Sequence, residues 1–254
     1  MARVLVTGSS TGLGLGAAQR LAGQGHAVTL HARDQARADD ARRECPDAEG
    51  VLVGDLTTIA GMRDVAEQAE HTGRFDAVIH NAALGYREPR QETEDGIEHV
   101  FAVNVLAPYL LTALMTPPDR LVYLSSGMHR GGTPDLDDLA WKRRRWNGSQ
   151  AYSDSKLYDV LLAFGIARRR PEVRSNAVDP GWIPTRMGGR GAPGSLEEGC
   201  DTQVWLAVSD DDAALVSGRY FHHRQERPTA PAARDTRLQD ALLERCAEIT
   251  GVSS

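Results

Sequence analysis

A tyrosine and a lysine four residues apart are the clearest candidates for acid–base chemistry. In Tyr152-Ser153-Asp154-Ser155-Lys156 this spacing places the phenol and the ammonium group on one face of a helix. A phenol ordinarily has a pKa of about 10, so it transfers protons near neutral pH only when a nearby cation stabilises its phenolate. Lys156 can supply that cation. Such a pair alone is common at protein surfaces, and its meaning depends on the motifs that accompany it.

A glycine-rich segment near the N-terminus indicates a site for a dinucleotide. Residues 7–14 read TGSSTGLG, follow a predicted strand and open a predicted helix. Glycines in such a turn let backbone amides approach a pyrophosphate at the positive end of the helix. A purely structural turn is the alternative, whereas a Walker loop is excluded because no Lys-Ser/Thr pair follows.

The end of the second predicted strand indicates which dinucleotide would bind. An acidic residue at this position would hydrogen-bond the adenosine ribose, but the sequence has Ala32 followed by Arg33. The absence of that carboxylate removes its repulsion of a 2′-phosphate, and the adjacent Arg33 guanidinium can hold that phosphate. We therefore expect NADP(H) rather than NAD(H), the alternative being that Arg33 is a solvated charge beside Asp34.

Short apolar runs that alternate with segments of helical periodicity must position these residues. We expect strands at residues 3–7, 27–31, 50–53, 75–80, 121–125, 173–178 and 219–222. Helices are expected at residues 14–24, 95–115, 151–169 and 238–249. The pattern predicts an α/β fold: a single domain with a doubly wound, Rossmann-type parallel sheet of about seven strands and helices on both faces.

Length and composition limit the classes of protein that fit. The 254 residues, 41% of them hydrophobic, suffice for one core, and the net charge of −6 argues against nucleic acid as a partner. No segment approaches 18 apolar residues, so we expect a cytoplasmic protein with no membrane partner. Cys45, Cys200 and Cys246 lie far apart, and His222-His223 lack metal-ligand spacing, so we expect neither disulfides nor a metal.

Two irregular segments follow predicted strands and therefore lie on the side of the sheet where ligands bind. We expect substrate loops at residues 127–150 and 186–199, with the Gly/Pro-rich residues 188–195 mobile. The basic run at residues 142–145 is expected to be a solvated face, the alternative being a site for an anionic substrate or a carrier protein. Apolar residues in or beside the loops predict a hydrophobic or aromatic substrate, with simple packing as the alternative for each. They are Met128, His129, Trp146, Trp182, Ile183 and Met187.

Together the motifs resemble the short-chain dehydrogenase/reductase family, and within it the retinol dehydrogenase-like branch. The matching pieces span nearly the whole chain: TGSSTGLG at 7–14, Asp55-Leu56, Asn81-Ala82-Ala83, Asn104, Ser125-Ser126, YSDSK at 152–156 and DPGWIPT at 179–185. The long segment 127–150 and Gly218-Arg219-Tyr220-Phe221 are similar to the branch. Where the family often has Asn-Asn-Ala-Gly, this chain has His80-Asn81-Ala82-Ala83, a mild change on the cofactor side.

The resemblance implies an oxidoreductase that transfers hydride between NADP(H) and a small carbonyl or alcohol compound. It implies that Tyr152 exchanges the hydroxyl proton, Ser126 hydrogen-bonds the substrate oxygen and Lys156 binds the nicotinamide ribose. Asn104 would hold a water of the proton relay. Spacing does not distinguish Ser125 from Ser126, and the family's usual second serine favours Ser126. The residues expected to bind the cofactor are Gly8, Ser10, Thr11, Gly12, Leu13, Gly14, Arg33, Asp55, Leu56, Asn81, Ala82, Ala83, Tyr152, Lys156, Pro180, Gly181, Ile183 and Thr185.

Two other functions fit part of the pattern. A sugar-nucleotide epimerase or dehydratase shares the Tyr-xxx-Lys pair, but its glycine-rich turn usually has another spacing and its larger C-terminal domain has no room here. A non-catalytic NADP sensor could keep the fold. The set Asn104, Ser126, Tyr152 and Lys156 argues against it, because a sensor needs no proton relay.

The helices at 95–115 and 151–169 form subunit contacts in many relatives, so a homodimer or tetramer is plausible.

Overall fold

Eight strands form one sheet in the computed structural model, which describes residues 1–253. Their order is β3-β2-β1-β4-β5-β6-β7-β8, and every neighbouring pair is parallel except β7 and β8. The strands are β1 (Arg3–Val6), β2 (Ala27–Ala32), β3 (Gly50–Val53), β4 (Ala77–His80), β5 (Arg120–Leu124), β6 (Arg174–Val178), β7 (Tyr220–His222) and β8 (Gln225–Glu226). The chain reverses direction across the sheet between β1 and β4, and open α/β sheets bind ligands beside such a reversal. The predicted doubly wound fold is confirmed.

The eighth strand is the departure from the expected count of about seven. His223 and Arg224 join β7 to β8 with φ angles of 51° and 57°, so the two strands form a tight antiparallel hairpin. β8 consists of two exposed polar residues. A run so short and polar has no apolar pattern, which is why the sequence does not reveal it.

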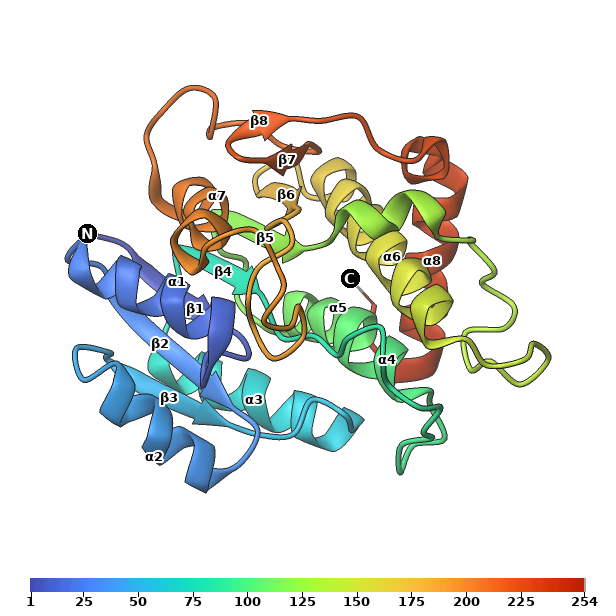
Figure 1. Cartoon of the computed structure of the whole chain (residues 1–254), viewed down its shortest axis with the longest axis horizontal. Coiled ribbons are helices and arrows are strands. Elements are labelled where there is room, and N and C mark those ends of the chain that lie inside the picture. The colour runs from blue at the N-terminus through green and yellow to red at the C-terminus, as the bar shows by residue number, and fades with distance from the viewer. Residues whose placement is uncertain (254) are drawn as a thin grey trace.

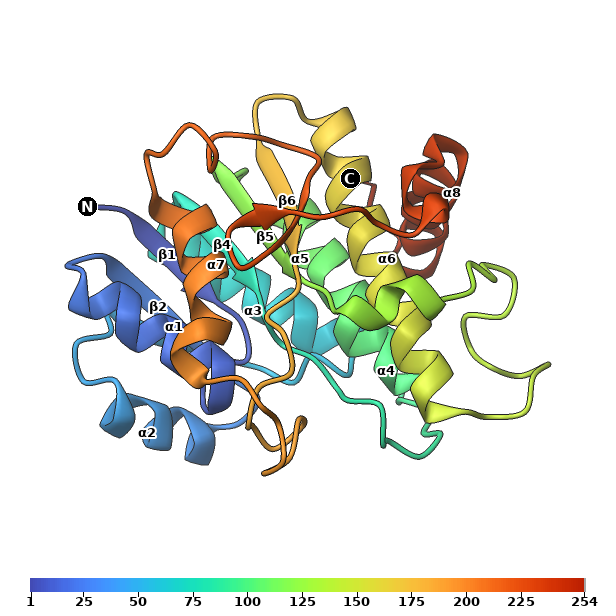
Figure 2. The same cartoon turned by 45° about the horizontal axis from the view of Figure 1, so that its top comes forward.

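Alternation of side chains along the strands divides the core into two layers. In β1, Val4 and Val6 belong to one buried cluster and Leu5 to the other. Helices α1 (Gly12–Gly23), α2 (Gln35–Glu44) and α7 (Leu196–Val208) cover the Val4 face. Helices α3 (Ile59–Thr72), α5 (Ala107–Leu114) and α6 (Gly148–Arg169) cover the Leu5 face, and α8 (Thr236–Thr250) packs against α5 and α6. Figures 1 and 2 show the sheet enclosed by these helices.

Periodicity does not predict α2, α3 or α7. In α2 only Ala38 and Ala41 are buried, and the helix is begun by Asp34, whose side chain accepts a backbone amide hydrogen bond. Helix α7 begins inside the expected loop 186–199, because Ser195 and Glu198 form a reciprocal capping box. Residues 196–199 of that expected loop are therefore helical.

The helix expected at 95–115 begins later and is interrupted. Gly96 has a φ of +74°, and the Glu98 side chain caps the short helix α4 (His99–Phe101). A π-helical turn, Ala102–Leu106, then separates α4 from α5 and contains Asn104. Such turns often occur at functional sites.

Both ends of the segment 127–150 are helical. It opens with a 3₁₀ helix at Gly127–Gly131, and it closes in the first turn of α6, where Asn147 accepts a hydrogen bond from the Gln150 amide. At 22 residues α6 is the longest helix. Neither it nor any other helix within residues 1–253 is sufficiently long and apolar to cross a membrane.

Candidate active site

The glycine-rich turn lies between β1 and α1, and its glycines are sterically required. Gly8 and Gly12 have φ angles of +61° and +60°, which disfavour any residue with a Cβ. A Cβ at Gly14 would lie 2.4 Å from Asn81 Nδ2 and 2.5 Å from the Gly8 carbonyl oxygen. Thr11, the N-cap of α1, makes no side-chain capping bond. The turn is therefore a tight cradle that exposes backbone at the positive end of α1.

Two side chains hold this turn, one on β2 and one directly after β4. Asn81 Nδ2 donates hydrogen bonds to the carbonyls of Thr7 and Gly8. His31 Nδ1 accepts from the Gly8 amide at 2.9 Å, so its proton is on Nε2, which lies 3.0 Å from the Gly54 oxygen. Burial lowers the pKa of His31 to about 4 and keeps it neutral. Sequence patterns alone do not predict this role for His31; its position on a buried strand beside the turn was the available signal.

Two guanidinium groups lie near the end of β2. Ala32 is buried, whereas the Arg33 side chain is 63% exposed with its Nε 3.3 Å from Asp34 Oδ2. Arg37, in the first turn of α2, has its Nε 3.7 Å from the same oxygen. Asp34 is thus shared between both arginines and the N-terminus of α2. Arg37 was missed because α2 was not predicted.

The remaining expected cofactor residues come from several loops around the turn. Asp55 is exposed and its Oδ1 accepts from the Thr57 amide at 2.9 Å. A Cβ on Gly12 would lie 3.7 Å from Thr185 Cγ2, so the segment after β6 reaches the glycine-rich turn. Leu56 and Ile183 are buried, while Ser10, Leu13, Ala82, Ala83, Pro180 and Gly181 are partly buried.

The phenol, ammonium group and one serine of the predicted set come together. Tyr152 is 7% exposed, the Ser126 side chain is close enough to lower its pKa, and Lys156 Nζ lies 5.6 Å from the centre of its ring. Burial raises the pKa of Tyr152, and the charge of Lys156 is the larger of the effects that oppose this rise. Ser125 instead donates its hydroxyl to the Lys156 carbonyl at 2.8 Å. Ser126 is therefore the serine that faces Tyr152.

Lys156 is buried and makes two strong contacts. Its Nζ donates to the Leu124 carbonyl at 2.7 Å and to Asp159 Oδ2 at 2.8 Å. Asp159 is not among the residues predicted from the sequence. Its spacing of one helical turn from Lys156 was the available signal of an ion pair. That spacing becomes informative only because α6 is deeply buried.

The Asn104 side chain is fully engaged with the protein. Its Oδ1 accepts from the Leu84 amide at 2.7 Å, and its Nδ2 donates to the Leu84 carbonyl and to Ser155 Oγ. These bonds join the π-helical turn to α6 and to the segment after β4. The backbone carbonyl is then the group of Asn104 that could act on a ligand.

The apolar residues expected at the substrate site divide into two groups. Trp182 and Met128 are exposed, at 58% and 37%. Met187 approaches Gly85, where a Cβ would lie 2.8 Å from its Cγ. Tyr86, which the sequence analysis missed, lies edge-on to Tyr152 with 6.0 Å between ring centres. The others are engaged by the protein: Trp146 Nε1 donates to the Glu88 carbonyl, His129 accepts from the Ala230 amide, and Ile183 is buried.

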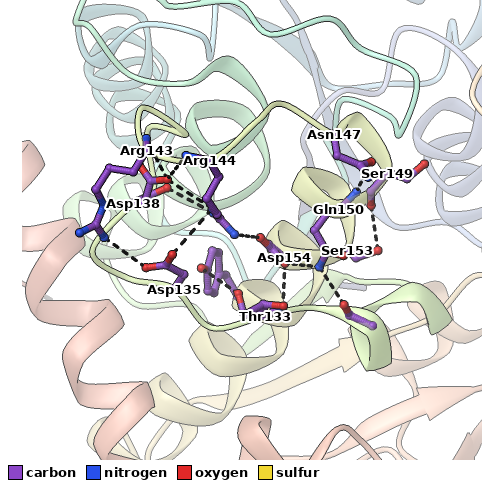
Figure 3. A network of polar contacts seen from close by, with 12 residues as sticks. Thr133, Asp135, Asp138, Arg143, Arg144, Asn147, Ser149, Gln150, Ser153 and Asp154 are labelled. Carbon is purple, nitrogen blue, oxygen red and sulfur yellow. Dashed lines mark hydrogen bonds and ion pairs between the residues drawn. The ribbon is translucent and has the colours of Figure 1, made fainter.

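The basic run at 142–145 is not simply a solvated face. Arg144 Nε lies 3.3 Å from Asp138 Oδ2 and its Nη1 3.2 Å from Asp154 Oδ2, and both carboxylates are buried (Figure 3). Its guanidinium also stacks over Trp141 at 3.8 Å. The expectation was wrong for Arg144, because charge patterning cannot show that two buried acids face it. Lys142 pairs with Glu92 at the surface.

The three cysteines are buried free thiols. Within residues 1–253 no group of three or more His, Cys, Asp or Glu side chains is placed to hold a metal ion.

Comparison with known proteins agrees with this arrangement. The family model described as short chain dehydrogenase matches residues 2–127. The chain is 42% identical to the short-chain dehydrogenase chry4 of Gibberella zeae, over 99% of this chain and 98% of that protein. It is 32% identical to retinol dehydrogenase 13 of Homo sapiens, over 99% of this chain and 85% of that protein.

Two solved structures have the same fold. One is of a putative uncharacterized protein from Mycobacterium paratuberculosis, with a TM-score of 0.85 and 27% identity, covering 100% of this chain and 94% of that one. The other is of a short-chain dehydrogenase from Sphingobium yanoikuyae in complex with NADPH, with a TM-score of 0.62 and 26% identity, covering 80% and 83%. The chain therefore belongs to the short-chain dehydrogenase/reductase family of oxidoreductases, and retinol dehydrogenases are among its relatives.

Proposed function

We propose that the protein is an NADP(H)-dependent reductase of small hydrophobic or aromatic carbonyl compounds. The observation that carries this proposal is the buried Tyr152 phenol, with the Lys156 ammonium group beside its ring and the half-buried Ser126 close enough to lower its pKa. Hydroxyl donors placed together next to a cation suit a reaction in which negative charge develops on an oxygen.

The glycine-rich turn fits a dinucleotide. The missing Cβ atoms of Gly8, Gly12 and Gly14 and the uncapped start of α1 leave backbone amides open to a pyrophosphate. Arg33 and Arg37 at the end of β2 would hold a 2′-phosphate, which favours NADP(H) over NAD(H). The NADPH complex of the related Sphingobium enzyme supports the same choice. When bound, NADPH would supply the hydride that the carbonyl carbon accepts.

The protein's part in the reaction is to stabilise charge and to deliver a proton. As negative charge builds on the substrate oxygen, the hydroxyls of Ser126 and Tyr152 donate hydrogen bonds to it. Tyr152 then transfers its phenolic proton to that oxygen, and the Lys156 charge stabilises the phenolate left behind. Because NADPH is usually held reduced in cells, we infer that carbonyl reduction is the physiological direction.

We assign the binding of a relay water to the backbone carbonyl of Asn104. The side chain of Asn104 is occupied by Leu84 and Ser155. Pro108, four residues further on, has no amide hydrogen, so this carbonyl lacks its usual α-helical donor. The π-helical turn at Ala102–Leu106 is the local form that the chain adopts there.

The substrate site is bounded by the segments 127–150 and 186–199, of which 127–131, 148–150 and 196–199 are helical. The side chains of Tyr86, Met128, Trp182 and Met187 make this region apolar, which favours hydrophobic or aromatic carbonyls. A small molecule is the expected partner, and assembly into a dimer or tetramer is part of the proposal.

Oxidation of NADPH and of NADH, followed optically with aromatic aldehydes, ketones, quinones and retinal-like carbonyls, tests this function. We expect turnover with NADPH and a loss of about 10²-fold or more in Tyr152→Phe, the usual contribution of a general acid. Arg33→Ala should weaken NADPH binding and leave NADH binding unchanged. Full turnover by Tyr152→Phe would refute the mechanism, and tight NADPH binding without turnover on any carbonyl would favour a sensor.

A further inference from the structure

A buried carboxylate that the proposed mechanism does not use lies against the site. Asp159 and Lys156 are each 2% exposed and stand one turn apart on α6. Lys156 Nζ lies 2.8 Å from Asp159 Oδ2. The two residues form a buried ion pair directly behind Tyr152.

Stability alone does not account for this pair. Removing two charges from water carries a large desolvation penalty, and apolar side chains of similar volume usually stabilise a core as well or better. The surrounding positions of α6, such as Leu157, Val160 and Leu161, are apolar and fully buried. A charged pair in such a place calls for an explanation in the chemistry of the site.

The geometry gives Asp159 control over where the ammonium group lies. Lys156 Nζ has three hydrogens, of which one points to the Leu124 carbonyl and one to Asp159. These two acceptors hold the nitrogen 5.6 Å from the centre of the Tyr152 ring and leave the third hydrogen for a ligand. A flexible lysine is thereby held in one position before any cofactor binds.

We propose that Asp159 is a positioning residue that holds the Lys156 ammonium group in place and partly offsets its charge at Tyr152. The proposal rests on the proposed function of the site. Its consequence is that Tyr152 stays protonated to a higher pH than beside a lone ammonium group. The site is thus biased towards proton donation, the role that carbonyl reduction requires.

The other groups near the phenol do not replace this effect. Asp179, after β6, also raises the pKa of Tyr152, while Ser126 lowers it. Tyr220, on β7, is a neutral phenol whose own pKa is raised by burial. Next to Asp159 itself, Tyr123 on β5 is buried and neutral because burial raises its pKa. Burial raises the pKa of Asp159, whereas the Lys156 ammonium group 2.8 Å away opposes this rise and favours the ionised carboxylate.

The test compares Asp159→Asn with the wild-type enzyme. The variant keeps the side-chain volume and an oxygen acceptor for Lys156 but removes the negative charge. We expect the alkaline limb of the pH profile of kcat/KM for NADPH-dependent reduction to move down by about one pH unit. Asp154→Asn is the matched control: it removes another buried carboxylate of α6, and we expect the wild-type limb to be retained. Thermal unfolding of each variant shows that it is folded.

A second readout does not depend on turnover. Ultraviolet titration of phenolate absorbance, taken as the difference from a Tyr152→Phe background, reports the pKa of Tyr152 directly. We expect this pKa to fall in Asp159→Asn. Unchanged values in both the kinetic and the optical titration would overturn the inference, even where Tyr152→Phe is inactive. If the wild-type protein reduced no carbonyl, the proposed function would fail while the optical titration still tested Asp159.

Discussion

Replacing Arg144 by methionine tests whether the segment before α6 is held by a buried ionic contact (Figure 3). The change keeps an unbranched apolar stem and removes the guanidinium that lies between Asp138 and Asp154. Both carboxylates keep other partners: Asp138 accepts from the Lys142 and Arg143 amides, and Asp154 from the Thr133 amide. The loss is therefore mainly that of two charged hydrogen bonds, together with a bond from Arg144 Nη2 to the Asp138 carbonyl and a 3.7 Å contact with Asp135.

The magnitude follows from those contacts. A hydrogen bond to a charged group contributes about 1.5–3 kcal/mol, but distances of 3.2 and 3.3 Å and a side chain 25% exposed place both contacts at the low end. Stacking on Trp141 adds about 0.5–1 kcal/mol. Together these contributions predict that Arg144→Met lowers the free energy of unfolding by about 3.5–4 kcal/mol. Burial raises the pKa of Asp154, so loss of its cationic partner should raise that pKa further.

Urea unfolding of the wild type, Arg144→Met, Asp154→Asn and the double variant gives both the single cost and the coupling between the two residues. We expect a coupling of about 1–2 kcal/mol in the direction of mutual stabilisation. Arg143→Met is the control, because Arg143 pairs only at the surface with Asp135, 3.6 Å away, and should cost less than about 1 kcal/mol. Equal, small losses in Arg143→Met and Arg144→Met would show that the whole run is solvated, and would refute this reasoning.

Two further predictions concern the serines and the histidine of the site. Ser126→Ala removes a donor to the developing oxyanion, so steady-state kinetics should show a kcat about 10²-fold lower. Ser125→Ala removes a hydrogen bond to the Lys156 carbonyl, so urea unfolding should mainly show a loss of about 1 kcal/mol of stability. Because the pKa of His31 falls from 6.5 to about 4 on folding, the unfolded chain binds its proton first as the pH falls. Neutral, buried His31 therefore stabilises the fold fully above about pH 6.5. As the pH falls to about 5, the free energy of unfolding should decrease by about 2 kcal/mol because of this residue. His31→Asn should remove that part of the pH dependence, and an unchanged slope in this variant would contradict the assignment.

Local patterns predict the motifs of this protein and fail for contacts between distant segments. The turn at 7–14 and the pair Tyr152 and Lys156 are visible because each depends on spacing within a single element. His31 contacts Gly8 and Gly54 from other parts of the chain, and no periodicity encodes that meeting. Helix α2 was not predicted because its only buried residues are two alanines, which form almost no apolar stripe.

The alternation of side chains along β5 predicts the direction of Ser125 but not that of Ser126. In β5, Leu121 and Tyr123 face the layer that contains α6, and Val122 and Leu124 face the opposite layer. Ser125 continues this alternation and reaches the Lys156 carbonyl on α6. After Leu124 the strand ends and the chain enters the 3₁₀ helix, so the direction of Ser126 depends on that turn. From the sequence, Ser126 could therefore be preferred over Ser125 only by resemblance to the family.

Helix α6 ties the stability of the fold to the assembly of the site. Residues 151–166 are buried without interruption, although Tyr152, Ser155, Lys156 and Asp159 are polar. Such groups destabilise a buried helix unless each finds a partner. Lys156 bonds to the end of β5 and to Asp159, Ser155 bonds to the π-helical turn, and Ser126 lies close to the Tyr152 phenol. The same hydrogen bonds that make α6 stable thus place every group of the proposed relay, so substitutions that loosen one partner should lower stability and activity together.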